Sequence, residues 1–225
     1  MAPCRKPTPS PPPPPPPPQP QPQPQPRTSS TPGPPCSTAA ARPPTPDRPA
    51  GSCVDHLRAV LGHVDALAGH ADDPDAVRLA AWFHDAVYRP DRSENEERSA
   101  ALAVRALTGA GLPPARVDEV ARLVRLTVTH HPGPGDRNGE VLCDADLAVL
   151  GGAPEAYAVY AAAVREEYAF VPEPDFRAGR AAVLRQLLAL PALYRTPTAH
   201  ARFDAPARAN LAAEVGRLET PGEDG

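Results

Sequence analysis

The distribution of proline limits what this chain can fold into more than any other feature. The chain has 225 residues and 35 prolines, and 22 of these prolines lie in residues 1–50, mainly in a run at residues 11–18 and a Gln-Pro repeat at residues 19–26. Proline lacks an amide hydrogen, and this segment has no spaced apolar residues, so it should stay extended and solvated. We therefore predict a disordered segment over residues 1–50 and one folded domain over residues 51–220.

Beyond residue 50 the apolar residues have helical spacing, recurring every three or four positions. Asp73 before Pro74 is typical of a helix start, and Gly109 of a helix end. We predict helices over residues 56–68, 74–88, 94–108, 113–130, 141–150, 154–170, 175–190 and 205–218. Residues 131–140 are rich in Gly and Pro and are predicted to form a loop, either an active-site lid or a plain connection. Because no segment alternates with a period of two, the expected fold class is all-α.

Charge separates the two parts of the chain. The net charge is −4, and residues 1–50 hold five basic side chains against one acidic side chain, a balance of +4 that leaves −8 for the rest. An acidic domain lacks the basic surface of a nucleic-acid binder and is suited to holding a cation. The sequence shows no secretory signal and no apolar stretch of about 18 residues. We therefore expect a cytoplasmic protein with no membrane or nucleic-acid partner.

The adjacent pair His84-Asp85 is the strongest sign of chemistry in the sequence. The pair follows the apolar residues Trp82 and Phe83 late in a predicted helix. Consecutive helical residues point about 100° apart, so both cannot face a hydrophobic core, whereas both can lean on one ion beyond the helix end. A buried imidazole and carboxylate need such compensation. We therefore expect the two residues to share a metal ion.

His56 and Asp146 extend the pair to an H…HD…D pattern drawn from separate predicted helices. Mixed nitrogen and oxygen ligands suit Mn²⁺, Co²⁺, Fe²⁺, Ni²⁺, Mg²⁺ or Zn²⁺ without selecting among them. Asp144 and Asp146 stand two apart and face different ways on a helix, so we assign only Asp146 as a ligand. Asp144 is then either a helix N-cap or a group that orients a ligand. The pattern as a whole suggests a metal-dependent hydrolase.

The other histidines give weaker signals. His56, His63 and His70 repeat every seven residues, about 10.5 Å along a helix, which is too far for them to share an ion. We therefore predict that His63 and His70 are solvated. His130 and His131 end the fourth predicted helix and are either favourable charges at a helix C-terminus or, beside the H…HD…D set, ligands of a second metal ion or contacts to a substrate phosphate.

Tyr168, Arg177 and Arg180 form a later group, together with Arg165, that is a candidate for substrate binding. Guanidinium groups match the geometry of phosphate oxygens. Lys6 is the only lysine, so arginine is the general basic residue of this chain and each single arginine is a weak phosphate signal.

Several ordered sequence blocks resemble those of one superfamily. They are WFHDAVY at residues 82–88, NEERSA at 95–100, THH at 129–131, DADL at 144–147, EY at 167–168, the stretch 177–184, and ARANL at 207–211. This set resembles a bacterial subgroup of predicted phosphohydrolases in the HD-domain superfamily, whose name describes the His-Asp pair. The H…HD…D pattern alone is loose, whereas the ordered set is specific and covers about residues 56–218.

The resemblance implies an HD-type helical bundle with four metal ligands, namely His56, His84, Asp85 and Asp146. It also implies hydrolysis of phosphate esters, usually of nucleotides. Some HD enzymes place a catalytic glutamate a turn after the pair, where this chain has Tyr88. We therefore take Glu96, together with Asp85, as the catalytic candidate; the alternative for Glu96 is a solvated first turn of a helix.

The chain departs from the subgroup before His56. Relatives have a further stretch of folded sequence there, and this chain has its proline-rich segment instead. We expect residues 1–54 to come from a misassigned start or a reading-frame error. If they are native, one wall of the metal site is open.

Three functions follow from these features. The first is a phosphomonoesterase or phosphodiesterase that uses a metal-activated water on a nucleotide or other small phosphorylated metabolite. The second is a catalytically impaired HD-domain sensor that binds a nucleotide or a metal ion. The third makes the proline-rich arm a ligand of SH3-type domains. The sequence leaves a homo-oligomer open.

Overall fold

Helices make up the regular structure of this protein. The computed structural model describes residues 51–89 and 92–220, with side chains from residue 54 onward, and all of these described residues belong to one compact unit. Within these ranges the chain forms α-helices and short 3-10 helices and no strand, so the predicted all-α class is confirmed. The disordered segment predicted for residues 1–50 and most of the segment expected from a misassigned start lie outside the described residues.

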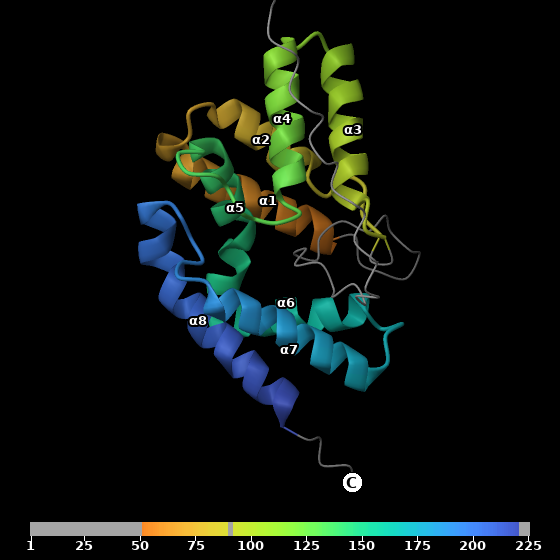
Figure 1. Ribbon diagram of the computed structural model, residues 1–225, viewed down its shortest axis with the longest axis vertical. Helices are drawn as coiled ribbons and strands as arrows, with labels where there is room; N and C mark the ends of the chain where they lie inside the picture. The colour runs from red at the N-terminus through yellow and green to blue at the C-terminus, as the bar shows by residue number, and fades with distance from the viewer. Residues whose placement is uncertain (1–50, 90–91, 221–225) are drawn as a thin grey trace, which may run out of the picture. The chain divides into compact units, whose positions relative to one another are not determined.

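The helices fall into two groups that meet at a short 3-10 helix. In chain order the elements are α1 (Gly51–Leu67), η1 (Ala68–His70), α2 (Pro74–Phe83), α3 (Asn95–Gly109), α4 (Pro114–Leu126), α5 (Arg137–Leu147), η2 (Ala148–Gly151), α6 (Pro154–Glu167), α7 (Glu173–Ala189) and α8 (Pro197–Glu219). In the first group α1, α2, α4 and α5 pack together and α3 lies along α4 (Figure 1). In the second group α7 lies along α8, and η2 contacts both α6 and α8 (Figure 1). The element η2 therefore joins the two groups.

Proline marks the starts of many of these helices. It occupies the first turn of five of them, at Pro74, Pro114, Pro154, Pro174 and Pro197. Its fixed φ suits that turn, where its missing amide hydrogen costs no helical bond. The predicted N-cap is confirmed, because the Asp73 side chain accepts a hydrogen bond from the Ala76 amide at 3.1 Å.

Helix α5 begins four residues earlier than predicted. The Asp136 carboxylate accepts from the Gly139 amide at 3.0 Å and caps the helix. A Cβ atom on Gly139 would lie 2.6 Å from Cδ2 of Leu126, so a larger residue here would require the Leu126 and Asp136 side chains to move. The prediction of a loop over residues 137–140 is wrong because these polar and glycine residues serve a helix cap and close packing.

Helix α8 begins at Pro197 and not near residue 205. Its N-cap is Thr196, whose hydroxyl accepts from the Ala199 amide at 3.2 Å. Pro206 lies inside the helix on an exposed position. The helix continues through it because Phe203 and Ala207 on either side are buried in the core, so the later start predicted from the sequence is wrong.

One apolar core runs through both groups. Its fully buried members include Val60, Val64, Val77, Val120, Leu123, Leu142, Leu184 and Leu211. Among the described helices, none is by itself long and apolar enough to cross a membrane; Arg137–Gly151 and Pro154–Glu167 meet that test only as a pair, across a bend of 102°.

Candidate metal centre

His84 and Asp85 lie just beyond the end of α2. The helix ends at Phe83, and the His84 amide makes the last bond, to the Ala80 carbonyl at 2.8 Å. The predicted continuation to residue 88 is wrong. His84 keeps helical backbone angles as the C-cap of α2, and both residues are buried, with exposed fractions of 3% for His84 and 8% for Asp85.

The orientation of the His84 ring is set by its own helix. Its Nδ1 lies 2.6 Å from the carbonyl oxygen of Ala81. A carbonyl can only accept a hydrogen bond, so Nδ1 carries the hydrogen and the neutral ring presents the lone pair of Nε2 on its other side. A hydrogen bond of this kind orients metal-binding histidines in proteins.

His56 and Asp146, from two other helices, lie close to Nε2 of His84. Nε2 of His56, on α1, lies 3.3 Å from Oδ1 of Asp146, on α5, and Nε2 of His84 lies 3.5 Å from the same oxygen. The ligand atoms of these three residues all lie within 4.8 Å of one another, so the group could hold a metal ion. Two ligands about 2.1 Å from one ion are about 3–4 Å apart, and the two separations from Oδ1 of Asp146 match this range.

Asp85 is the fourth predicted ligand and lies beside the group. Its Oδ2 is 3.2 Å from Nε2 of His84. This oxygen, Nε2 of His84 and Nε2 of His56 are buried and make no hydrogen bond within the described part of the chain. Buried polar atoms are almost always satisfied, so unsatisfied atoms gathered at one place indicate a ligand. The role of Asp85 as a direct ligand stays a prediction.

The electrostatics of these residues favour a cation. Burial would lower the pKa of His84, but the carboxylates of Asp85 and Asp146 outweigh burial and raise this pKa well above its ordinary value. Burial would raise the pKa of Asp146, yet the nearby histidines lower it well below its ordinary value. The carboxylates thus draw positive charge to Nε2 of His84, and a divalent ion bound there would displace the proton.

His130 reaches the same residues through a strained backbone. Its amide donates to the Leu126 carbonyl at 3.0 Å, and its φ of 49° is left-handed, a conformation in which glycine usually ends a helix. Its Nε2 lies 2.8 Å from Oδ2 of Asp146. His131 is exposed. Of the predicted pair, only His130 joins the set, which we call the His/Asp cluster and which comprises His56, His84, Asp85, His130 and Asp146.

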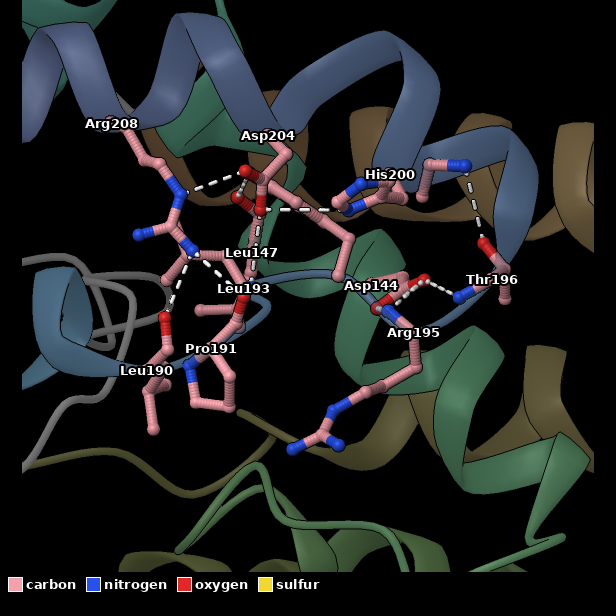
Figure 2. Close-up of polar contacts among 12 residues, drawn as sticks. Asp144, Leu147, Leu190, Pro191, Leu193, Arg195, Thr196, His200, Asp204 and Arg208 are labelled. Atoms are coloured by element: carbon pink, nitrogen blue, oxygen red, sulfur yellow. Dashed lines mark hydrogen bonds and ion pairs between the residues drawn. The ribbon is translucent and has the colours of Figure 1, made fainter.

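Asp144 and Asp146 face different ways on α5, as predicted. Figure 2 shows the Asp144 carboxylate pointing to the backbone just before α8, where it accepts from the amides of Arg195 at 2.9 Å and Thr196 at 2.7 Å. The N-cap alternative for Asp144 is wrong, because α5 starts well before it. The residue instead ties the start of α8 to the helix that carries Asp146.

Glu96, at the start of α3, and Tyr168, at the end of α6, are both buried. Each has an exposed fraction of 8%. Burial is the main cause that raises the pKa of Tyr168, and the negative charges of Glu167 and Glu96 add to it. Burial and Glu167 likewise raise the pKa of Tyr88. Both phenols therefore stay protonated at neutral pH, and the catalytic role of Glu96 stays a prediction.

Arg177 and Arg180 have partners within the protein. Arg177 donates to the carbonyls of Arg217 and Thr220 at the end of α8. Arg180 is buried and donates through Nε to Oε1 of Glu214 at 2.8 Å. These bonds give each guanidinium a structural role, and substrate binding by Arg177, Arg180 and Tyr168 stays a prediction.

His63 and His70 have contacts that the sequence did not indicate. Nε2 of His70 lies 2.6 Å from Oε2 of Glu140. His63 is half-buried, and its ring meets the Phe203 ring edge-on with centroids 5.3 Å apart. The prediction that both are simply solvated is wrong, although neither joins the group that could hold a metal ion.

A pocket of about 360 Å³ lies between α1 and α6 and includes His56 and Asp146. Its α6 wall consists of Ala156, Val159, Tyr160 and Ala163. Sequence reasoning missed this pocket. The three- and four-residue spacing of the α6 residues indicated a common face, but not that the face borders the cluster.

A scan against protein-family models finds no family that matches the chain, and searches of curated proteins and of solved structures find no match. The HD-type fold and the phosphohydrolase activity expected from the sequence blocks therefore stay predictions. The chemistry of this protein is inferred from the geometry of the His/Asp cluster.

Proposed function

We propose that this protein is a metal-dependent phosphohydrolase, a phosphomonoesterase or phosphodiesterase that acts on a nucleotide or another small phosphorylated metabolite. One observation carries the proposal: buried ligand atoms of His56, His84 and Asp146 lie within 4.8 Å of one another, and the two Nε2 atoms make no hydrogen bond among the described residues. In the reaction, water adds to phosphorus and one ester P–O bond breaks, which releases an alcohol and inorganic phosphate from a monoester, or an alcohol and a phosphate monoester from a diester.

The cluster residues have distinct roles in this proposal. His56, His84 and Asp146 hold a divalent ion, with Asp85 beside His84. When bound, the ion supplies Lewis-acid activation of water and of a phosphoryl oxygen. His130 orients Asp146 through the 2.8 Å contact between Nε2 and Oδ2.

The proposal includes membership of the HD-domain superfamily. The adjacent His84 and Asp85 together with His56 and Asp146 form its H…HD…D pattern in the sequence. The all-α fold and the meeting of His56, His84 and Asp146 in space support it. Mixed nitrogen and oxygen ligands are compatible with Mn²⁺, Co²⁺, Fe²⁺, Ni²⁺, Mg²⁺ and Zn²⁺.

Metal analysis combined with a substrate panel tests the proposal. The purified full-length chain is assayed for bound metals, then for hydrolysis of nucleotides and sugar phosphates with Mn²⁺, Co²⁺ or Mg²⁺. We expect metal binding and metal-dependent release of phosphate or of the alcohol. We expect Asp85→Ala and His84→Ala to lower both metal binding and turnover.

His70→Ala is the matched control, because His70 forms a histidine–carboxylate contact of 2.6 Å with Glu140 outside the cluster. This variant should keep both properties. Unchanged metal content and hydrolysis in Asp85→Ala and His84→Ala would contradict the proposal. Retained metal without turnover of any substrate would favour the sensor function instead.

A further inference from the structure

We propose that the pocket between α1 and α6 binds the uncharged organic part of a substrate that carries a single phosphate group. The inference rests on the proposed function, because the phosphate is placed at the His/Asp cluster. It narrows the substrate class to monophosphate esters such as nucleoside monophosphates. Nucleoside di- and triphosphates and sugar bisphosphates should be poor substrates.

The pocket adjoins the His/Asp cluster. His56 and Asp146 belong both to the group that could hold a metal ion and to the pocket lining. A phosphoryl group bound at the cluster therefore has the rest of its molecule beside or within the pocket. The volume of about 360 Å³ lies within the range of about 300–1,000 Å³ typical of small-molecule sites.

The walls of the pocket are mainly apolar. Helix α1 contributes Ala59 and Val60, and α6 contributes Ala156, Val159 and Ala163. Val159 is 72% exposed, so a large apolar side chain faces solvent at the rim of a pocket beside a buried polar cluster. Apolar walls with a few polar groups are typical of sites that bind the organic part of a ligand.

The charge of the pocket lining limits the number of phosphate groups that a bound substrate can carry. None of the described lining residues is Lys or Arg, and Asp55 and Asp146 are acidic. Arg180 lies 5.5 Å from the centre of the Tyr160 ring but is bonded to Glu214. A metal ion at the cluster therefore supplies the positive charge for one phosphate, and a second phosphate in the pocket would meet acidic and apolar groups.

His63 offers the pocket a neutral hydrogen-bonding group. It lines the α1 wall, and burial first, then the charge of Arg202, lower its pKa below the ordinary value. A neutral imidazole has one donor and one acceptor. These suit a hydroxyl or amide of a sugar or base better than a further phosphate.

The test compares one nucleoside in three phosphorylation states. The full-length chain loaded with Mn²⁺ is assayed with the nucleoside mono-, di- and triphosphate. We expect kcat/KM for the monophosphate to exceed that for the triphosphate by about tenfold or more, since tenfold corresponds to about 1.4 kcal/mol.

Val159→Arg adds a cation at the pocket rim and should reduce this preference by about tenfold, mainly through a lower KM for the triphosphate. Ala162→Arg adds the same charge to the same helix at an exposed position outside the lining and should leave the preference unchanged. Circular dichroism checks that both variants fold.

The outcomes separate this inference from the proposed function. Metal-dependent hydrolysis that favours the triphosphate, or a preference that Val159→Arg does not change, overturns the pocket assignment and leaves the phosphohydrolase intact. If metal is bound without turnover, the same series is measured by calorimetry, and equal affinities overturn the assignment. Absence of both metal binding and hydrolysis overturns the two proposals together.

Discussion

The His/Asp cluster and the Arg180 cluster, which consists of Arg180, Glu214 and Tyr157, are both buried, yet their polar atoms are satisfied differently. Arg180 donates to both carboxylate oxygens of Glu214, at 2.8 and 3.3 Å, and the Tyr157 hydroxyl donates to the same carboxylate. One positive and one negative charge match, and donors meet acceptors. This network is complete without a ligand.

The His/Asp cluster is not complete in this sense. Nε2 of His56, Nε2 of His84, Nδ1 of His130 and Oδ2 of Asp85 are buried and make no hydrogen bond among the described residues. Nε2 of His56 and Nε2 of His84 lie beside the carboxylates of Asp146 and Asp85, and a cation bound between them would satisfy these atoms. Nδ1 of His130 is the ring nitrogen that does not contact Asp146. The comparison teaches that burial of polar residues alone does not identify a site, whereas unsatisfied acceptors aimed at one point do.

The largest effect should come from Asp146→Asn. Losing this ligand should lower turnover by about 10³-fold, because a catalytic ion supplies several kcal/mol. The metal-free chain should also lose about 1–3 kcal/mol of its free energy of unfolding at neutral pH, because the histidines that lower the pKa of Asp146 stabilise its charged form in the folded chain. Steady-state kinetics and urea unfolding with a chelator measure the two quantities. A large loss of metal-free stability with unchanged turnover would assign the cluster a structural role.

Arg180→Ala should lower stability more than Asp146→Asn does and turnover less. Removing one partner leaves Glu214 buried and uncompensated, which should cost about 3–5 kcal/mol of unfolding free energy. The triple variant Arg180→Met, Glu214→Leu, Tyr157→Phe removes all partners together and should recover most of this loss. Urea unfolding measures both variants. A loss below about 1 kcal/mol for Arg180→Ala would show that the Arg180 cluster does not stabilise the fold as a unit.

Variants of His130 test whether this residue contributes to metal binding and turnover while its left-handed backbone lowers the stability of the fold. His130→Gly and His130→Ala should each lower metal affinity and turnover about 10–100-fold, because the group that orients Asp146 is lost. His130→Gly should be more stable than His130→Ala by about 1 kcal/mol, since glycine tolerates the left-handed backbone.

This order reverses the usual advantage of Ala over Gly in helices. Urea unfolding and calorimetric metal titration measure the two effects. Greater stability of the alanine variant would mean that the backbone at His130 is not strained. Unchanged metal affinity in both variants would exclude the orienting role.

The smallest expected effect is on the pH dependence of stability, through the half-exposed carboxylates of Glu119 and Asp136. Hydrogen bonds from Arg122 are the main cause that lowers the pKa of Glu119. Burial opposes ionisation of Asp136, but hydrogen bonds from Arg122 and the Gly139 amide outweigh it and lower that pKa. Both pKa values are lower in the folded chain than in the unfolded chain, where carboxyl pKa values are about 4. The ionised Glu119 and Asp136 therefore stabilise the folded chain fully at pH values above this. This stabilisation is lost as the pH falls through the folded values.

Arg122→Met should therefore cost about 0.5–1 kcal/mol at neutral pH and lose less stability than the parent chain on acidification below about pH 4. Urea unfolding across this pH range measures the difference. Arg185→Met, which removes an exposed ion pair with Glu219 on other helices, is the control. An acid profile identical to that of the parent chain would contradict the assignment.

Local sequence features were sufficient to predict helix starts and side-chain directions that depend on residues within one helical turn. Asp73 with Pro74 predicted the start of α2 because an N-cap acts on amides two or three residues away. The two-residue spacing of Asp144 and Asp146 predicted that they face different ways, and they do. Gly139 misled the prediction of the start of α5, because a helix cap and close packing against Leu126 decided that this residue does not interrupt the helix.

The sequence by itself determined the all-α class, the helix starts near Pro74, Pro114 and Pro154, and the residue types that can hold a metal ion. Only the tertiary structure decided which of them meet: His130 joins Asp146 while His131 is exposed, and Arg180 pairs with Glu214. It also placed the faces of α1 and α6 around a pocket. Helix starts depend on a few neighbouring residues, whereas these meetings depend on how helices distant in sequence pack, which no single segment encodes.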